Sequence, residues 1–386
     1  MDKTLSDLVK ISRAVGGDSY LVQGGGGNTS VKTDDGKYMY IKASGTPLKD
    51  MNRRAGWRKL HLDSVLSIIK DKSVSQLDIP AREAKVVNRL LLACRDKTAG
   101  NSRPSVEAHL HAFLGKCVIH LHPSAVLAYL NAKNGKARLL KLFKDQKPPA
   151  LWVPYAAPGF SLAKKISKLI SDYQKRFGQK PSILLLEKHG LIVSANNPDS
   201  ALRLVRMIMA RCKSKLKQAK ITKLKSIDRK IINETKSIIR KAFYESSGRD
   251  IAISYFYNNL IGDFMSEKNA PQMLRPPALT PDELLYTNGP AMWLEKPDRK
   301  KIIREITKQL QRNVRPTVTF LVKDIGLFIA SKPNTVCTVR DIVLSSLVIR
   351  ANAFRMGGIT TLTKHQRGFI NHWEADAFRL KVAQGG

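Results

Sequence analysis

Three histidines occupy positions from which their imidazoles could bind a metal ion. His120 and His122 lie two residues apart in an apolar run, residues 117–122, that is typical of a β-strand. Side chains two positions apart on a strand point to the same face of the sheet. His189 stands immediately before Gly190, in a turn between two further apolar runs, and such a turn can bring its side chain over a neighbouring strand. Catalytic zinc sites use three protein ligands and keep one position open; the His-x-His pair alone fits a packed pair of structural histidines equally well.

Glu107 is the acidic residue that could act beside such a metal. It begins a predicted helix directly after residues 103–105. A carboxylate near a helix N-terminus is stabilised by the helix dipole, so a capping acid is one interpretation and a general acid/base is the other. His111 lies four residues further along the same helix face, where we expect it to pack below the carboxylate. We expect His109 to lie outside the site.

Two loops rich in small residues could bind an anion through their backbone N–H groups. They read GGGNTS at 25–30 and ASGT at 43–46, and both add hydroxyl or amide side chains. Backbone nests of this kind bind phosphate. Neither loop has the GxGxxG or P-loop spacing, which argues against a nucleotide. Plain tight turns are the alternative interpretation of both loops.

The predicted elements mix helices with hairpin-paired strands and lack the strict alternation of a doubly wound parallel sheet. Residues 266–283 contain four prolines and are predicted to be a linker. This linker would separate a catalytic unit, residues 1–265, from a smaller unit, residues 284–386.

The smaller unit repeats a pattern of the first. Segments 181–191 and 316–327 each begin with Pro, continue as an apolar run to a Lys and then reach Gly-Leu. The second segment has Asp324 and Ile325 where the first has His189. We interpret the smaller unit as a degenerate copy that lost its histidine, and we predict no second metal there.

Composition excludes several classes of protein. Hydrophobic residues make up 43% of the 386 residues, which supports a packed core and excludes general disorder. The four cysteines form no CxxC pair, which excludes a disulfide scaffold or a thiolate zinc ribbon and suits a reducing cytosol. The N-terminus does not resemble a signal peptide, and no apolar run is long enough to span a bilayer. We expect a cytoplasmic protein with no membrane partner.

The formal net charge is +36, from 67 Lys and Arg against 31 acidic residues. An excess of this size attracts anions, but it does not choose among nucleic acid, acidic membranes and phosphorylated metabolites. The densest basic segment, residues 211–241, has apolar residues at roughly helical spacing and is predicted to be a solvated helix face. It has no interleaved aromatic residues, so nucleic acid is not the expected partner.

These segments, in this order, resemble the class II aldolase/adducin family. Five motifs carry the resemblance over residues 1–215: GGGNTSVK at 25–32, KASGT at 42–46, RPSVE at 103–107, HLHP at 120–123 and KHGL at 188–191. The GGGNTSVK form and the second unit together look most like the aldolase part of bifunctional rhamnulose-1-phosphate aldolase/alcohol dehydrogenase proteins. No GxGxxG follows, so we expect the dehydrogenase part to be absent.

The resemblance implies an α/β fold, an α/β/α sandwich around a mainly antiparallel sheet. It also implies a divalent metal, most often Zn²⁺, and a site between subunits of a homo-oligomer, commonly a tetramer. The implied metal ligands are His120, His122 and His189, with Glu107 as the acid/base. The implied ligands of the substrate phosphate are residues of the small-residue loops: Asn28, Thr29, Ser44, Gly45 and Ser105. Val106 departs from the family pattern, in which Ser is frequent, and this leaves backbone N–H groups and Ser105 to hold a phosphate there.

The expected activity is therefore that of a zinc-dependent class II aldolase acting on a small sugar phosphate. Such an enzyme would cleave a phosphorylated ketose, such as rhamnulose 1-phosphate, into dihydroxyacetone phosphate and an aldehyde. An epimerase, dehydratase or decarboxylase on the same scaffold would share the metal and the phosphate loops. A non-catalytic, adducin-like interaction module is the third alternative, and the presence of all three histidines argues against it.

Overall fold

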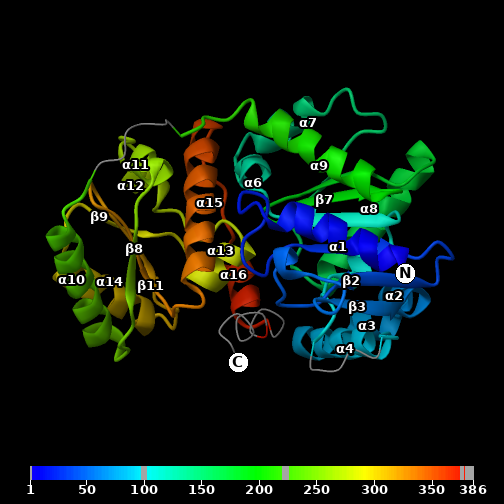
Figure 1. Ribbon diagram of the computed structural model, residues 1–386, viewed down its shortest axis with the longest axis horizontal. Coiled ribbons are helices and arrows are strands. Elements are labelled where there is room, and N and C mark those ends of the chain that lie inside the picture. The colour runs from blue at the N-terminus through cyan, green and yellow to red at the C-terminus, as the bar shows by residue number, and fades with distance from the viewer. Residues whose placement is uncertain (1, 97–101, 220–225, 374–377, 379–386) are drawn as a thin grey trace.

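The protein is described from a computed structural model, which covers residues 2–96, 102–219, 226–373 and 378. It contains a seven-stranded sheet and a four-stranded sheet, each with helices packed on it (Figure 1). The predicted mixed α/β fold with a mainly antiparallel sheet is confirmed. Within the described residues no helix has the length and apolar character needed to cross a bilayer.

The seven-stranded sheet has the order β3-β2-β1-β4-β7-β6-β5. All neighbouring strands are antiparallel except β5 and β6, which are parallel. The strands are β1 (Asn28–Lys32), β2 (Tyr38–Lys42), β3 (Trp57–His61), β4 (Cys117–Leu121), β5 (Leu151–Val153), β6 (Ile183–Leu186) and β7 (Gly190–Ala195).

Helices cover both faces of this sheet and form the predicted α/β/α sandwich. One layer contains α1 (Lys3–Gly16), α6 (Ser124–Leu130), α7 (Gly135–Leu142) and α9 (Pro198–Lys213). The other contains α2 (Leu62–Lys70), α3 (Lys72–Gln76), α4 (Ile79–Leu92), α5 (Ala108–Ala112) and α8 (Phe160–Phe177), and a short 3₁₀ turn, η1 (Leu48–Asp50), precedes β3.

Alternation along β4 decides which of these layers its side chains face. Ile119 and Leu121 pack in the core shared with α1, α6 and α9, whereas Val118 packs in the core shared with α5 and α8. His120 lies two residues after Val118 and so faces the same layer. The candidate site therefore forms on the side of the sheet that carries α5.

The four-stranded sheet has the order β8-β11-β10-β9, with only β9 and β10 parallel. Its strands are β8 (Ile253–Phe256), β9 (Met292–Leu294), β10 (Thr319–Val322) and β11 (Gly326–Ala330). One face packs against α10 (Arg229–Ser247) and α14 (Arg299–Gln311). The other packs against α11 (Asn259–Met265), α12 (Ala270–Met273), α13 (Pro281–Thr287) and α15 (Val336–Arg355), and α16 (Lys364–Asn371) follows. In Figure 1, α15 stands between the two sheets.

The second sheet repeats the arrangement of half of the first. The order β8-β11-β10-β9 corresponds strand for strand to β4-β7-β6-β5, including the one parallel pair. Both hairpins turn through a residue with positive φ, Lys188 at 55° and Asp324 at 60°. The residue after this turn position is His189 in the first copy and Ile325 in the second. The topology thus supports the interpretation of the second unit as a degenerate copy.

The prediction of a linker at residues 266–283 is wrong. The segment contains α12 and the start of α13, and Met273 and Leu279 are buried. Pro271 and Pro281 stand in the first turn of these helices, where a missing N–H costs nothing. Proline here marks helix starts instead of an extended connection. β8 is a strand of the second sheet and α10 packs on that sheet, so the second unit begins near residue 229 and not at residue 284.

The basic segment 211–241 is divided between two helices. α9 ends at Lys213 and α10 begins at Arg229, and residues 220–225 lie outside the described part of the chain. On α10 the buried residues Thr235, Ile239, Ala242 and Phe243 share one face. The charged residues lie on the other face, as expected of an amphipathic surface helix.

Candidate metal centre

The imidazoles of His120, His122 and His189 converge on one point. The Nε2 atom of His120 lies 3.2 Å from Nε2 of His122 and 3.3 Å from Nε2 of His189. A tetrahedral zinc ion with metal–nitrogen bonds of about 2.0–2.1 Å sets its ligand nitrogens about 3.3 Å apart. All three rings are buried. The spacing and chemistry of the three nitrogens therefore fit one divalent ion.

The β4–β7 strand pair brings these side chains together. His120 lies on β4 and His122 just beyond it, while His189 lies in the β6–β7 turn, and Leu121 pairs with Leu191. Gly190 permits the approach of the strands. A Cβ atom there would lie 2.4 Å from the Leu121 carbonyl oxygen, 2.9 Å from Cδ2 of His122 and 3.3 Å from Cε1 of His120.

Two of the three rings are oriented through their Nδ1 atoms. Nδ1 of His120 lies 3.0 Å from the carbonyl oxygen of Leu191, and a carbonyl can only accept, so Nδ1 carries the proton. Nδ1 of His122 lies 2.5 Å from Oδ2 of Asp282. Both contacts leave the Nε2 lone pair free for a metal ion.

Burial keeps His120 and His189 neutral, which is the form that binds metal. Burial lowers the pKa of His120 to about 4, partly offset by Glu107. It lowers the pKa of His189 to about 3, and Glu107 again acts in the opposite direction. Burial by itself would raise the pKa of Glu107, but His120, His189 and a hydrogen bond from Asn28 together bring this pKa below its usual range. Glu107 is therefore ionised at neutral pH.

The Glu107 side chain is directed at the histidines. It stands at the N-cap position of α5 but makes no capping hydrogen bond. Its Oε2 lies 3.5 Å from Nε2 of His120 and its Oε1 lies 3.5 Å from Nε2 of His189. Nδ2 of Asn28 donates a 2.8 Å hydrogen bond to Oε2. The geometry favours the acid/base interpretation of Glu107 over the capping one.

A pocket opens above this cluster, and the small-residue loops form part of its wall. The loops are joined to each other, because Ser44 N–H donates to the Arg103 carbonyl at 2.7 Å and Ser105 N–H donates to the Lys42 carbonyl at 3.0 Å. The pocket is lined by Gly25, Gly27, Asn28, Lys42, Ser44, Gly45, Ser105, Val106, Glu107, His122, Pro158, His189, Pro281, Asp282 and Trp373.

Residues 6–216, more than half of the chain, match the family model described as the class II aldolase and adducin N-terminal domain. The chain belongs to the class II aldolase and adducin family. The matched residues include the three histidines, Glu107 and both small-residue loops. Of the residues that line the pocket, Pro281, Asp282 and Trp373 lie outside the match.

One curated relative is similar to nearly the whole chain, at low sequence identity. It is 23% identical over 427 residues to a protein named "Uncharacterized oxidoreductase YuxG" from Bacillus subtilis (strain 168). That match covers 99% of this chain but only 59% of the relative, so the chain spans less than two thirds of that protein's length.

Two solved structures are similar to about half of the chain. The N-terminal class II aldolase domain of a conserved protein from Thermoplasma acidophilum is 28% identical, with 55% of this chain and 94% of that chain covered and a TM-score of 0.45. A sugar-phosphate aldolase from Thermotoga maritima is 15% identical, with coverages of 55% and 93% and a TM-score of 0.40.

Thr29 does not line the pocket of this class II aldolase family member, although it was predicted to bind the substrate. Side chains on β1 alternate, so Asn28 and Thr29 point to opposite faces of the sheet. Asn28 pairs with His120 across the strands and faces the site. Thr29 is fully buried on the other face, where its hydroxyl lies 2.6 Å from that of Ser12 on α1. The other predicted phosphate ligands, Asn28, Ser44, Gly45 and Ser105, do line the pocket.

The two histidines of α5 lie outside the cluster. Nδ1 of His111 lies 2.8 Å from the hydroxyl of Ser30, and its ring is completely buried. His109 is also completely buried and does not line the pocket. The contact with Ser30 places His111 between α5 and β1.

Two charged residues of the pocket were not predicted from the sequence. Lys42 ends β2, is 3% exposed, and its Nζ lies 3.1 Å from the Gly25 carbonyl oxygen; a lysine directly before the 43–46 loop is a signal that could have been used. Asp282 comes from α13, within the segment predicted as a linker, and no local pattern connects it with His122.

Proposed function

We propose that the chain is a zinc-dependent aldolase that cleaves a phosphorylated ketose, such as rhamnulose 1-phosphate, into dihydroxyacetone phosphate and an aldehyde. The observation that carries the proposal is the cluster of three imidazole nitrogens with the Glu107 carboxylate 3.5 Å from two of them, those of His120 and His189. Membership of the class II aldolase and adducin family supports the same reaction class.

His120, His122 and His189 would hold the ion. A zinc ion there would supply Lewis acidity at the substrate's carbonyl and hydroxyl oxygens, which is worth several kcal/mol of transition-state stabilisation. Three histidines leave a coordination position open for this purpose.

Glu107 would move the proton. In the cleavage direction, the hydroxyl next to the breaking bond loses a proton and the electrons of the carbon–carbon bond pass to the ketone fragment. The ionised Glu107 carboxylate would accept a proton and return it to the carbon that has gained those electrons. Asn28 holds Oε2 at 2.8 Å, which fixes the orientation of the carboxylate.

Ser44, Gly45 and Ser105 would hold the substrate phosphate, together with Lys42. The N–H groups of Ser44 and Ser105 already donate to protein carbonyls, so the hydroxyls of these serines would donate to the phosphate instead. The Lys42 ammonium, which donates to the Gly25 and Ala43 carbonyls, would attract the phosphate through its charge. The positive net charge of the chain would attract such a substrate.

Substrate entry would require the rim to move. The cavity bounded by the lining residues measures about 50 Å³, whereas ligand pockets usually measure roughly 300–1,000 Å³. Pro281 and Trp373 belong to the lining and come from the second unit, so movement of this unit's edge would open the site.

We also propose that the chain forms a homo-oligomer such as a tetramer, which light scattering of the purified protein tests.

The decisive experiment is a retro-aldol assay over a panel of ketose 1-phosphates with metal removed and restored. We expect activity to disappear in chelator and to return with Zn²⁺, and activity that is unchanged without metal would refute the proposal. Product analysis by NMR separates the alternatives on the same scaffold, because an epimerase, a dehydratase and a decarboxylase do not yield dihydroxyacetone phosphate and an aldehyde.

A further inference from the structure

Asp282 connects the second unit to the metal centre of the first. It lies in the first turn of α13, 160 residues from His122 in the sequence, yet its Oδ2 lies 2.5 Å from Nδ1 of that ring. Both side chains are largely buried, at 11% and 7% exposure. Nδ1 of His120 meets a backbone carbonyl instead, and Nδ1 of His189 has no hydrogen-bond partner among the described residues.

We propose that Asp282 is a positioning residue that fixes the Nδ1–H tautomer of His122 and strengthens Nε2 as a metal ligand. The second unit would thereby complete the metal centre of the first. This inference rests on the proposed function, since it assumes that the three histidines hold a divalent ion.

The chemistry of the contact supports this role. A carboxylate only accepts hydrogen bonds, so the proton between the two atoms belongs to Nδ1, and the lone pair is then on Nε2. Nε2 of His122 is the atom that lies 3.2 Å from Nε2 of His120. A carboxylate behind a metal-binding imidazole orients the ring and raises its basicity.

Close packing fixes Asp282 against this ring. A Cβ atom on Gly26 would lie 3.1 Å from Oδ2 of Asp282 and 3.4 Å from Nδ1 of His122. The GGGNTS loop, predicted to bind an anion, therefore also passes close to this contact. An acid in the first turn of a helix is stabilised by the helix dipole, but that effect does not require Oδ2 to approach His122.

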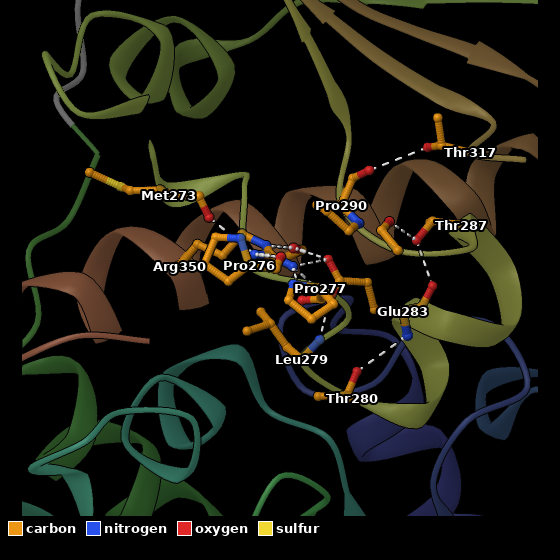
Figure 2. Close-up of polar contacts among 12 residues, drawn as sticks. Met273, Pro276, Pro277, Leu279, Thr280, Glu283, Thr287, Pro290, Thr317 and Arg350 are labelled. Carbon is orange, nitrogen blue, oxygen red and sulfur yellow. Dashed lines mark hydrogen bonds and ion pairs between the residues drawn. The ribbon is translucent and has the colours of Figure 1, made fainter. Parts of the chain in front are cut away.

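A buried network fixes the residue next to Asp282. Figure 2 shows the guanidinium of Arg350, on α15, beside the carboxylate of Glu283, with Nη2–Oε distances of 3.0 and 3.2 Å. Arg350 is completely buried and also donates to the carbonyl oxygens of Met273, Pro276 and Pro277. The network thus attaches residues 273–283 to α15 and sets where α13 begins.

The same helix also reaches the segment that follows His122. The hydroxyl of Ser345 on α15 lies 2.8 Å from that of Ser124, two residues after His122. α15 thus contacts a residue close to His122, Ser124, and the residue next to Asp282, Glu283. This shared support gives the contact a defined geometry, which an orienting role requires.

The Zn²⁺ affinity of the 386-residue chain tests the inference. Zn²⁺ dissociation constants are measured by competition with a chromophoric chelator for the wild type, D282N, D282E and a control, D298N. Asp298 lies in the same unit and caps α14 by accepting from Lys301 N–H, a role that Asn also performs. We expect D282N to bind Zn²⁺ about 10–100-fold more weakly, D298N to bind as the wild type does, and D282E to bind more tightly than D282N.

The comparison with D282E separates positioning from packing. A packing role predicts the opposite order, because Asn has the size of Asp whereas Glu is longer. Thermal unfolding of each metal-free variant is the second measurement. A loss of affinity at unchanged midpoint supports the inference, and a loss that follows a lowered midpoint overturns it.

Failure of the inference is distinguishable from failure of the proposed function. A wild type that binds one Zn²⁺ per chain while D282N binds it equally well overturns only the role of Asp282. A wild type that binds no divalent ion overturns the proposed function and, with it, this inference.

Discussion

Substitution of Gly190 by alanine should disrupt the metal centre without removing a ligand. The added Cβ would lie 2.4 Å from the Leu121 carbonyl oxygen, where a relaxed contact needs at least about 3 Å. The β4–β7 pair must therefore separate by roughly half an ångström. Metal sites tolerate ligand displacements of about 0.2 Å, and the substituted turn carries His189 while the opposing strand carries His120.

We expect Gly190→Ala to bind Zn²⁺ at least tenfold more weakly than the wild type and to lose about 1–3 kcal/mol of unfolding free energy through overpacking. Chelator competition measures the affinity, and urea unfolding of the metal-free protein measures the stability. Gly368→Ala is the matched control, since no atom lies within 4 Å of its added Cβ and alanine favours its helix. Wild-type Zn²⁺ affinity in Gly190→Ala would refute the close-approach argument.

Three further predictions address the proton, the phosphate and pH. Glu107→Gln keeps the size of the side chain but removes the proton carrier, so kcat should fall by about 10²–10⁴ with zinc still present by elemental analysis; a kcat within tenfold of wild type would contradict the role. Lys42→Met should raise KM for the phosphorylated ketose about tenfold or more, because a charge-assisted hydrogen bond is worth about 1.5–3 kcal/mol; an unchanged KM would exclude Lys42 from phosphate binding. Burial lowers the pKa of His109 to about 4 and that of His111 to about 3, so between these values and about 6.5 the unfolded chain binds more protons. Urea unfolding of the metal-free protein should accordingly show a lower unfolding free energy at pH 5 than at pH 7.5, and equal values would show that these rings are not buried neutral.

The histidine cluster could be predicted because local rules determine most of it. The two-residue spacing of His120 and His122 on an apolar run fixes their shared side of β4, and the turn before Gly190 fixes where His189 stands. The same alternation rule, applied to the GGGNTS loop, would have excluded Thr29. That loop was expected to be irregular, so the start of β1 at Asn28 was not anticipated and the opposite directions of Asn28 and Thr29 were missed.

The contribution of the second unit could not be predicted in the same way. Asp282 reaches His122 through tertiary packing over 160 residues of sequence, and no periodicity encodes such a contact. Prolines suggested a linker at 266–283, although two of them occupy helix first turns, where proline is favoured. Distinguishing a helix start from a linker requires knowing that Met273 and Leu279 have a core to enter. That core includes α15, which begins 63 residues after Met273 and 57 residues after Leu279.

The second sheet repeats half of the strand order of the first, and tyrosines stand at the positions of the strand histidines. Leu121 pairs with Leu191 in the first sheet as Phe256 pairs with Leu327 in the second, so Tyr255 and Tyr257 stand where His120 and His122 stand.

The Tyr255 hydroxyl donates to the carbonyl oxygen of Ile325, the residue at the place of His189. The space that holds the imidazole cluster in the first copy is thus bridged by a structural hydrogen bond in the second. The second unit instead supports the first through α15, the helix after its hairpin. α15 packs on α6 and fixes α13 beside His122. This support matters because the rigidity of a metal centre depends on the residues behind its ligands.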